Sequence, residues 1–306
     1  MASSSTISSA FFLPALVVIL LFLSSSAWGH PSNHHQWESF RNLSGCQLGE
    51  RHDGLAQLKR YLHHFGYLPA ARSPAANFND DFDPELESAL IAYQNFFNLN
   101  VTGRLDAPTL DLITTPRCGV PDVIVNKTTT SADSLRRSLY NYFPGTPRWP
   151  RHRYNLRYAF VSLAGAPAGI GTLRALFARA FGQWSAVTPL TFSETDYNYG
   201  NADIRISFTA MDGPGGTLAY AYAPTHGGLL VDWSETWWVA VAGSLSAGDI
   251  FDLESVVVHE IGHILGLDHS DVARAIMYPT IAPRTRKVNL ANDDIWGVWG
   301  LYGRRY

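Results

Sequence analysis

The chain has 306 residues, of which 46% are hydrophobic and 16% are charged, and its formal net charge at pH 7 is −3. Apolar residues are numerous enough for a sizeable core. The charged fraction is below the roughly 25% of an average soluble protein. The charge balance gives no electrostatic reason to expect a nucleic-acid-binding protein, and two cysteines are too few for a disulfide scaffold. The length suggests two domains, and the composition leaves a soluble enzyme or a binding protein.

The first 29 residues contain no charged side chain, and an apolar run over 11–23 ends at three serines. Small residues at Ala27 and Gly29 suit cleavage before His30, which predicts a signal peptide and secretion. A signal anchor is the alternative, but the run is shorter than the roughly 20 residues that cross a bilayer. Three N-x-S/T triplets are candidates for glycosylation in the secretory pathway: Asn42, Asn100 and Asn126.

A small helical module is predicted over residues 51–115. Apolar side chains recur at helical spacing from Leu55 to Phe65. Asp83 followed by Pro84 is typical of a capped helix start, and a third short helix is expected near Asp106. These apolar stripes indicate a core and carry no function by themselves.

The most informative run, HEIGHILGLDH, extends from His259 to His269. A helix that begins after Asp252 would carry His259 and His263 one turn apart on one face, so both imidazoles could bind one ion. Gly266 can adopt the left-handed conformation that ends a helix, after which His269 returns as a third ligand. Three imidazoles leave one position of a tetrahedral zinc open, which is typical of a catalytic site.

Glu260 lies off the face of the histidine pair, where it could reach a water molecule on the metal. The pattern therefore predicts peptide hydrolysis. Zinc would acidify the water, and Glu260 would accept the water proton as general base and pass it to the leaving amine. The alternative is a set of ordinary surface histidines on a helix.

A second motif, PRCGVPD, extends from Pro116 to Asp122. A thiolate is a strong zinc ligand, and the prolines would hold the segment extended along a substrate cleft. Cys118 would then occupy the fourth zinc position and exclude the catalytic water, which predicts a latent form. The alternative is a disulfide between Cys118 and Cys46. If the thiols are not joined, Cys46 has no evident role.

The histidine run resembles the zinc motif of the metzincin clan, and PRCGVPD is similar to the cysteine switch of the matrixins, the matrix metalloproteinases. Ser270, and a turn that places Met277 beneath the zinc, fit the same family. The resemblance extends from about residue 46 to 306 and is strongest to plant matrixins that lack a hemopexin domain. It implies an α+β fold: a zincin-like metalloprotease domain, with a twisted mixed sheet and three helices, after a three-helix peptidoglycan-binding-like prodomain.

This resemblance divides the chain into four parts: signal peptide 1–29, prodomain with cysteine switch 30–122, linker with the activation cleavage region 123–139, and catalytic domain 140–306. It implies a secreted zinc endopeptidase made as a zymogen. The location would be extracellular, and it would be the apoplast or cell wall space if the source is a plant. We expect a monomer that acts on proteins or peptides, binds no nucleic acid and has no transmembrane segment. The charged ending also predicts no lipid anchor.

Within the catalytic domain, the apolar spacing from Leu173 to Trp184 predicts a long amphipathic helix. Four runs are predicted strands: 156–162, 203–209, 217–223 and 228–232. By resemblance, Arg117 and Asp122 would pair and brace the switch segment.

The resemblance also implies a calcium site at a glycine-rich loop, with Asp212, Asp232 and Glu235 as its acidic ligands. Carboxylate and carbonyl oxygens suit Ca²⁺. The ligands of the family's second, structural zinc are missing, because its histidine positions hold Tyr220 and Leu230. We therefore predict one catalytic zinc and no structural zinc.

Substrate contacts follow from the resemblance as well. Leu218 and Ala219 would offer an exposed strand edge to an extended peptide. Ser255 would lie at the bottom of a deep specificity pocket that favours a large apolar residue, or would be a helix residue with no such role. The opposite wall of the cleft would contain Pro279, Thr280 and Ile281.

A second functional hypothesis is a catalytically inactive extracellular protein that binds cell-wall glycan through the helical module. The presence of both Glu260 and the third histidine favours the enzyme.

Overall fold

The computed structural model describes residues 37–69, 78–122, 141–196, 201–239 and 249–305. The predicted signal peptide, Asn126 and the predicted linker over 123–139 therefore lie outside the described residues. Asn42 and Asn100 are both exposed.

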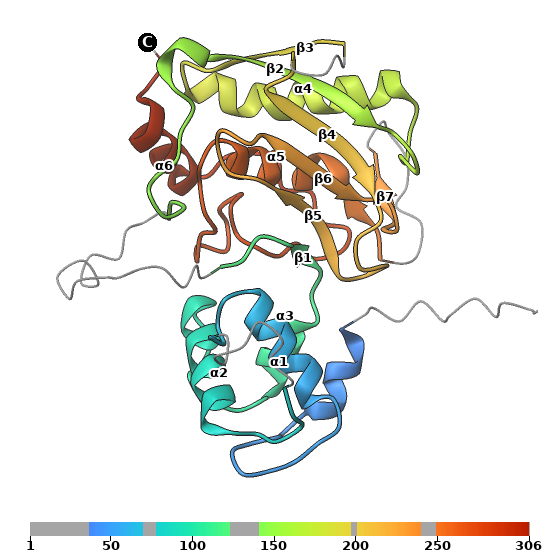
Figure 1. Cartoon of the computed structure of the whole chain (residues 1–306), viewed down its shortest axis with the longest axis vertical. Helices are drawn as coiled ribbons and strands as arrows, with labels where there is room; N and C mark the ends of the chain where they lie inside the picture. Colours follow the sequence, from blue (N-terminus) through green and yellow to red (C-terminus); the bar gives the residue numbers. More distant parts are fainter. Residues whose placement is uncertain (1–36, 70–77, 123–140, 197–200, 240–248, 306) are drawn as a thin grey trace, which may run out of the picture. The chain divides into compact units, whose positions relative to one another are not determined.

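The helical module forms as the sequence predicts (Figure 1). Asp83 and Asp106 cap the second and third α-helices, since their side chains accept hydrogen bonds from backbone N–H groups three residues later, and a proline lies in each first turn. The helices are η1 (Glu38–Leu43), α1 (Leu55–His64), α2 (Pro84–Phe96) and α3 (Ala107–Ile113).

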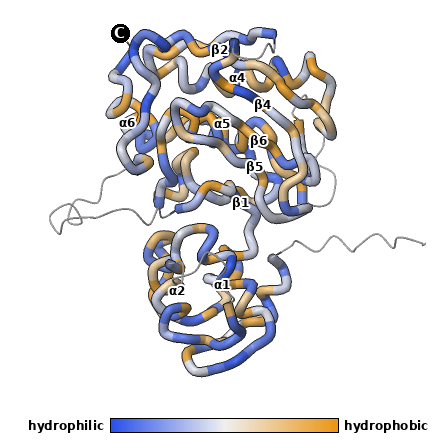
Figure 2. Tube along the Cα trace, in the orientation of Figure 1, coloured by the Kyte–Doolittle hydropathy of each residue, from blue (hydrophilic) through white to orange (hydrophobic). Residues whose placement is uncertain are grey.

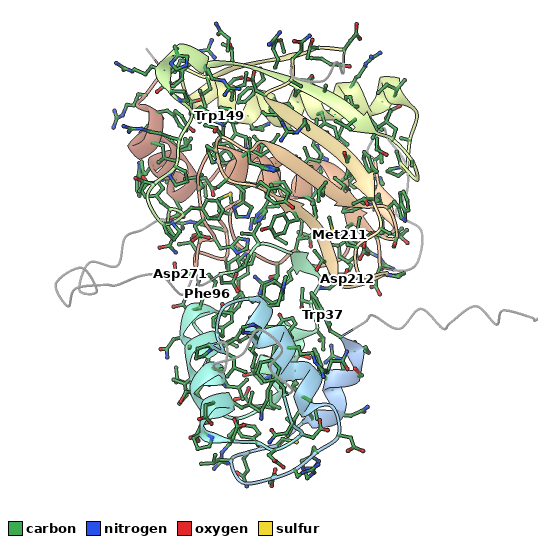
Figure 3. The ribbon with its side chains drawn as sticks, viewed as in Figure 1. Trp37, Phe96, Trp149, Met211, Asp212 and Asp271 are labelled. Atoms are coloured by element: carbon green, nitrogen blue, oxygen red, sulfur yellow. The ribbon has the colours of Figure 1, made fainter. Side chains whose placement is uncertain are left out.

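Aromatic side chains fill the core of this module. Tyr61 contacts the rings of Trp37, Phe40 and Phe65 edge to face, with centroids 4.8 to 5.9 Å apart. Figure 3 labels Trp37 and Phe96 here, whereas the labelled Trp149 belongs to a separate core in the C-terminal region. The described residues thus contain two separate hydrophobic cores.

The C-terminal region contains a six-stranded mixed sheet in the order β1-β5-β6-β4-β2-β3. Neighbouring strands are parallel except β5 and β6, which are antiparallel. The four predicted strands are present, and the sequence analysis missed β3. The strands are β1 (Arg117–Cys118), β2 (Asn155–Ser162), β3 (Thr191–Glu194), β4 (Ile204–Thr209), β5 (Thr217–Ala221) and β6 (Gly228–Asp232), with β7 (Trp237–Trp238) and β8 (Phe251–Asp252) in a small second sheet.

Three α-helices accompany the sheet: α4 (Ile170–Val187), α5 (Leu253–Ile264) and α6 (Asn292–Tyr302). A short turn of 3-10 helix, η2 (Arg151–Arg153), precedes β2. Helix α5 packs against α4, β5 and β6, and every one of its residues is buried. Figure 2 shows the resulting hydrophobic character of α5. Burying a polar side chain in such a helix costs free energy unless the side chain has a partner or a function. The histidines and Glu260 of α5 are therefore candidate functional residues.

Both ends of α5 follow the predicted local chemistry. The Asp252 side chain accepts a hydrogen bond from the backbone N–H of Ser255 and caps the helix start. Gly266 follows the helix with φ +102°, and a Cβ there would overlap the carbonyl oxygen of Pro147. Only glycine fits this position, so the chain can turn back sharply toward His269.

Among the described residues, no helix combines the length and the apolar character that crossing a bilayer requires.

Candidate active site

The three histidines of the HEIGHILGLDH run converge in the structure. Helix α5 carries His259 and His263, and the turn at Gly266 brings His269 back to them. The Nε2 atom of His263 lies 3.1 Å from Nε2 of His259 and 3.1 Å from Nε2 of His269. All three side chains are buried.

Each imidazole is oriented by an acceptor at its other nitrogen. Nδ1 of His259 lies 2.8 Å from the carbonyl oxygen of Ile276, and Nδ1 of His263 lies 2.8 Å from that of Leu267. A proton on Nδ1 leaves the Nε2 lone pairs free for a metal. Burial, and then a neighbouring histidine, lower the pKa of both rings, which favours the neutral ligand form.

This arrangement fits a zinc ion. Lone pairs that face one another at 3.1 Å repel unless a cation lies between them. Tetrahedral zinc with Zn–N bonds of about 2.0 Å would separate its nitrogen ligands by about 3.3 Å. The donor set and the spacing therefore match zinc.

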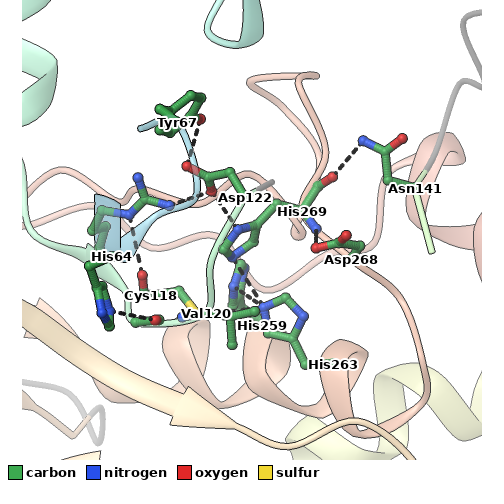
Figure 4. A network of polar contacts seen from close by, with 12 residues as sticks. His64, Tyr67, Cys118, Val120, Asp122, Asn141, His259, His263, Asp268 and His269 are labelled. Atoms are coloured by element: carbon green, nitrogen blue, oxygen red, sulfur yellow. Dashed lines mark hydrogen bonds and ion pairs between the residues drawn. The ribbon is translucent and has the colours of Figure 1, made fainter. Parts of the chain in front are cut away.

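The thiol of Cys118 joins the histidines. Its Sγ lies 3.4 Å from Nε2 of His263, and the four ligand atoms lie within 4.8 Å of one another (Figure 4). Cys118 and Cys46 are both free, which excludes the disulfide alternative for this structure. Burial, and then the nearby Glu260, raise the pKa of the Cys118 thiol, so a thiolate here requires a cation.

Strand β1 holds this thiol in place by backbone hydrogen bonds on both sides. The N–H of Cys118 donates to the carbonyl oxygen of Pro279 at 2.9 Å, and the N–H of Gly119 donates to that of Ala219 at 2.9 Å. The β5 edge is therefore paired within the chain itself, and its contact with a substrate peptide stays a prediction. Leu218 and Ala219 are buried because the chain's own residues 117–119 pair with that edge.

Arg117 and Asp122 form the predicted ion pair, and both side chains are fully buried. The guanidinium of Arg117 also packs over the ring of Phe65, 3.7 Å from its centroid. Asp122 has two further contacts that the sequence analysis missed: it accepts from the Tyr67 hydroxyl at 2.6 Å and lies 2.7 Å from Nδ1 of His269. One carboxylate thus links the switch segment, the helical module and a metal-binding histidine (Figure 4).

The charge of Asp122 is strongly favoured. Burial alone would raise the pKa of this carboxyl group, but Arg117 and then His269 outweigh it and lower the pKa to about 2. Asp122 is therefore an anion that keeps the imidazole of His269 oriented.

Glu260 is completely buried, and neither of its carboxylate oxygens meets hydrogen-bond geometry with a partner. Burial raises its pKa to about 8, and the Cys118 thiol acts in the opposite direction. A buried carboxyl group without a partner is costly, so its position beside the histidines indicates a functional constraint.

The turn that contains Met277 lies directly against α5. A Cβ on Gly262 would clash with the Met277 sulfur and approach the Trp184 ring at 3.0 Å. The backbone N–H groups of Ile276 and Met277 both donate to the Asp294 carboxylate, at 2.9 and 3.0 Å. Sequence analysis missed Asp294; its position in the first turn of a capped helix was the available signal.

Most of the predicted substrate-binding residues line one cavity beside the histidines. Its volume is about 30 Å³, far below the 300 Å³ or more of a ligand pocket, so this cavity does not form the predicted deep pocket in the structure. The Ser255 hydroxyl is held by Asp252 and by the backbone N–H of Lys287. The lining includes Leu218, Ser255, Pro279, Thr280, Ile281 and Cys118.

The three predicted calcium ligands lie near one another but do not form a compact group. Burial, together with the charges of Asp232 and Asp212, raises the pKa of Glu235 to about 7. Glu235 accepts from the N–H of Gly215 at 2.8 Å. One buried oxygen of Asp232 has no partner. Among the described residues, no group that includes these acids has all its ligand atoms within 4.8 Å.

Comparison with known proteins identifies the family. A protein-family model described as Matrixin matches residues 148–303, and a model for a peptidoglycan binding domain matches residues 51–113. The chain belongs to the matrixin family. It is accordingly a zinc-dependent metalloendopeptidase of the α+β class, with a helical module before the protease domain.

Several known proteins are similar to this matrixin over most of its length. Metalloendoproteinase 2-MMP of Arabidopsis thaliana is 41% identical over 94% of this chain and 84% of its own length. Metalloendoproteinase 1 of Glycine max is 47% identical over 83% of this chain and 84% of its own length. Stromelysin-1 of Rattus norvegicus is 37% identical over 83% of this chain and 50% of its own length. The predicted similarity to plant matrixins is confirmed.

Proposed function

We propose that this matrixin is a secreted endopeptidase made as a latent zymogen, in which Cys118 occupies the position of the catalytic water. One observation carries the proposal: the Cys118 sulfur and the three Nε2 atoms form one buried group. Four protein ligands would close the coordination of the metal, whereas three would leave it open. In this proposal residues 1–29 direct export, 30–122 inhibit, and cleavage within 123–139 releases the catalytic domain, 140–306.

We assign His259, His263 and His269 as the ligands of the catalytic zinc. A zinc ion held there supplies an electrophile for the peptide carbonyl and acidifies water. Glu260 is the general base: its carboxylate accepts the water proton and then donates it to the leaving amine. Burial raises its pKa to about 8, which suits a group that must carry a proton near neutral pH.

Substrate would take the place of β1. Once residues 117–119 leave, the carbonyl oxygens of Ala219 and Pro279 lose their partners and can accept hydrogen bonds from an extended peptide. Ser255, Thr280 and Ile281 then lie beside the cleaved bond, where we assign them to the specificity pocket with Leu218 and Pro279.

Two proposals concern further metals. Asp212, Asp232 and Glu235 are assigned to a calcium site, because burial, and then the charges of the two aspartates, raise the pKa of Glu235, and a hard cation would offset both effects. Tyr220 and Leu230 stand where the family's second zinc would need histidines. Metal analysis of the activated form should therefore give one zinc per chain, and two would contradict the assignment.

The central experiment measures cleavage of a fluorogenic peptide library before and after removal of the region that precedes residue 140. The intact chain should be latent and the processed chain active, and N-terminal sequencing identifies the cleavage point. Glu260→Ala should lower the activity of the processed chain by about 10²- to 10⁴-fold. Asp196→Asn, which alters an exposed carboxylate, is the matched control.

Wild-type activity in Glu260→Ala would refute the proposed mechanism. The glycan-binding alternative is favoured by the match of residues 51–113 to a peptidoglycan binding domain. Binding to cell-wall glycan without any peptide cleavage after processing would support it.

A further inference from the structure

A second cluster of metal-ligating side chains lies in the helical module, apart from the active site. Cys46, Glu50 and His52 each direct one potential ligand atom to the same place, and these atoms lie within 4.8 Å of one another. All three belong to the segment between η1 and α1. In the part of the chain that the structure describes, the only other such group is that of Cys118 and the three histidines.

One direct contact joins two of the three side chains. The His52 Nε2 and Glu50 Oε2 atoms are 3.8 Å apart, which is an ion pair only when the imidazole is protonated and is beyond hydrogen-bond distance. The Cys46 side chain is buried, and no hydrogen bond joins its thiol to the side chain of another described residue. A cation between the three would supply the interaction that they lack.

The backbone at each of these positions is anchored to another part of the module. The carbonyl oxygen of Cys46 accepts from the N–H of Leu105 at 3.2 Å, and that of Glu50 accepts from Phe82 at 2.7 Å. The N–H of His52 donates to the carbonyl oxygen of Asp80 at 3.0 Å. The ligand positions are therefore fixed before any ion arrives, which lowers the entropic cost of binding.

The orientation and exposure of the three side chains also suit an ion that enters from solvent. The Glu50 oxygen that faces His52, Oε2, also accepts from the N–H of Gln47 at 3.0 Å, which orients the carboxylate toward the cluster. The side chains of His52 and Glu50 are 48% and 41% exposed, whereas Cys46 lies at the edge of the core. The site thus has a buried soft ligand and an open outer side.

We propose that Cys46, Glu50 and His52 form a zinc site in the helical module, with water in the fourth position. Thiolate, imidazole and carboxylate together suit Zn²⁺, whereas Ca²⁺ and Mg²⁺ prefer oxygen ligands alone. Binding replaces the S–H bond of Cys46 with a Zn–S bond and releases one proton to solvent. The ion would join the segment before α1 to the core of the module, and Cys46 thereby gains a role.

The test is the number of zinc ions per chain in the full-length protein, measured with calcium in excess after removal of loosely bound metal. His52→Ala and Cys46→Ser should each contain one zinc fewer than the wild type. Asp53→Asn, which removes an exposed acidic charge beside the site, should keep the wild-type number. The difference between variants is the readout, so the result depends on neither peptidase activity nor the number of zincs elsewhere.

Equal zinc content in the wild type and His52→Ala would overturn the proposal. Because Cys46 is buried, Cys46→Ser could lose zinc by unfolding the module. The variants at the exposed residues His52 and Glu50 therefore provide the decisive comparison. Loss of zinc in Cys46→Ser alone, with full content in both His52→Ala and Glu50→Gln, would also overturn it.

Discussion

The substitution Asp122→Asn tests how the chain keeps Cys118 in place. Asparagine keeps the size of the side chain but has only one acceptor oxygen, whereas the Tyr67 hydroxyl bonds Oδ2 of Asp122 and His269 lies beside Oδ1. The substitution removes the negative charge, so the Arg117 guanidinium stays buried without its counter-ion. One guanidinium nitrogen, Nη1, already lacks a partner, and the Phe65 ring offers no compensating charge.

The magnitude follows from burial. Both partners of the ion pair have no exposed side-chain surface. Breaking a buried pair by removing one partner costs about 3–5 kcal/mol. That cost applies to the docked segment, because the released segment would expose Arg117 to water. Taking 3 kcal/mol, the released fraction should rise about 150-fold.

The assay is the rate at which a thiol reagent modifies Cys118 in the unprocessed chain, followed by mass spectrometry so that Cys46 is counted separately. This rate reports the released population when docking is fast relative to modification. Peptide cleavage by the same unprocessed chain should rise in parallel.

The matched control is Asp81→Asn, which breaks the exposed ion pair between Arg51 and Asp81. Exposed pairs contribute little, so modification of Cys118 should change by less than about fivefold. If Asp122→Asn changes the rate no more than this control, the buried pair does not hold the segment, and the reasoning fails.

Two further predictions concern stability. Burial raises the pKa of Glu235 from its usual 4.5 to about 7; the folded chain therefore holds a proton that the unfolded chain loses between these values. Without calcium, stability should fall by about 3 kcal/mol as pH rises through this window, and calcium should remove the slope. Denaturant titrations at pH 5 and 8 with a calcium-selective chelator measure this, and a flat profile would contradict it. Gly262→Ala should lower the melting temperature because its Cβ clashes with Met277, whereas Gly182→Ala, in open space on α4, should raise it slightly. Changes of the same sign in both variants would contradict the close packing beneath α5.

Sequence alone determined the local features of this protein. The spacing of His259, His263 and His269, the Asp252 cap and the turn at Gly266 depend on neighbours within a few residues, where helix geometry and backbone sterics decide the outcome. The starts of α2 and α3 were predictable for the same reason, since a capping aspartate and a proline act within one turn.

Contacts between residues that are far apart in the sequence were decided by the tertiary structure. Cys118 is 145 residues from His263, and Asp122 is 147 residues from His269, so their contacts depend on how the whole chain packs. The pairing of β1 with β5 also depends on the tertiary fold, because an unpaired edge can form hydrogen bonds with any strand that packs beside it. Convergence of Cys46, Glu50 and His52 likewise depends on hydrogen bonds to Asp80, Phe82 and Leu105, which only the folded module supplies.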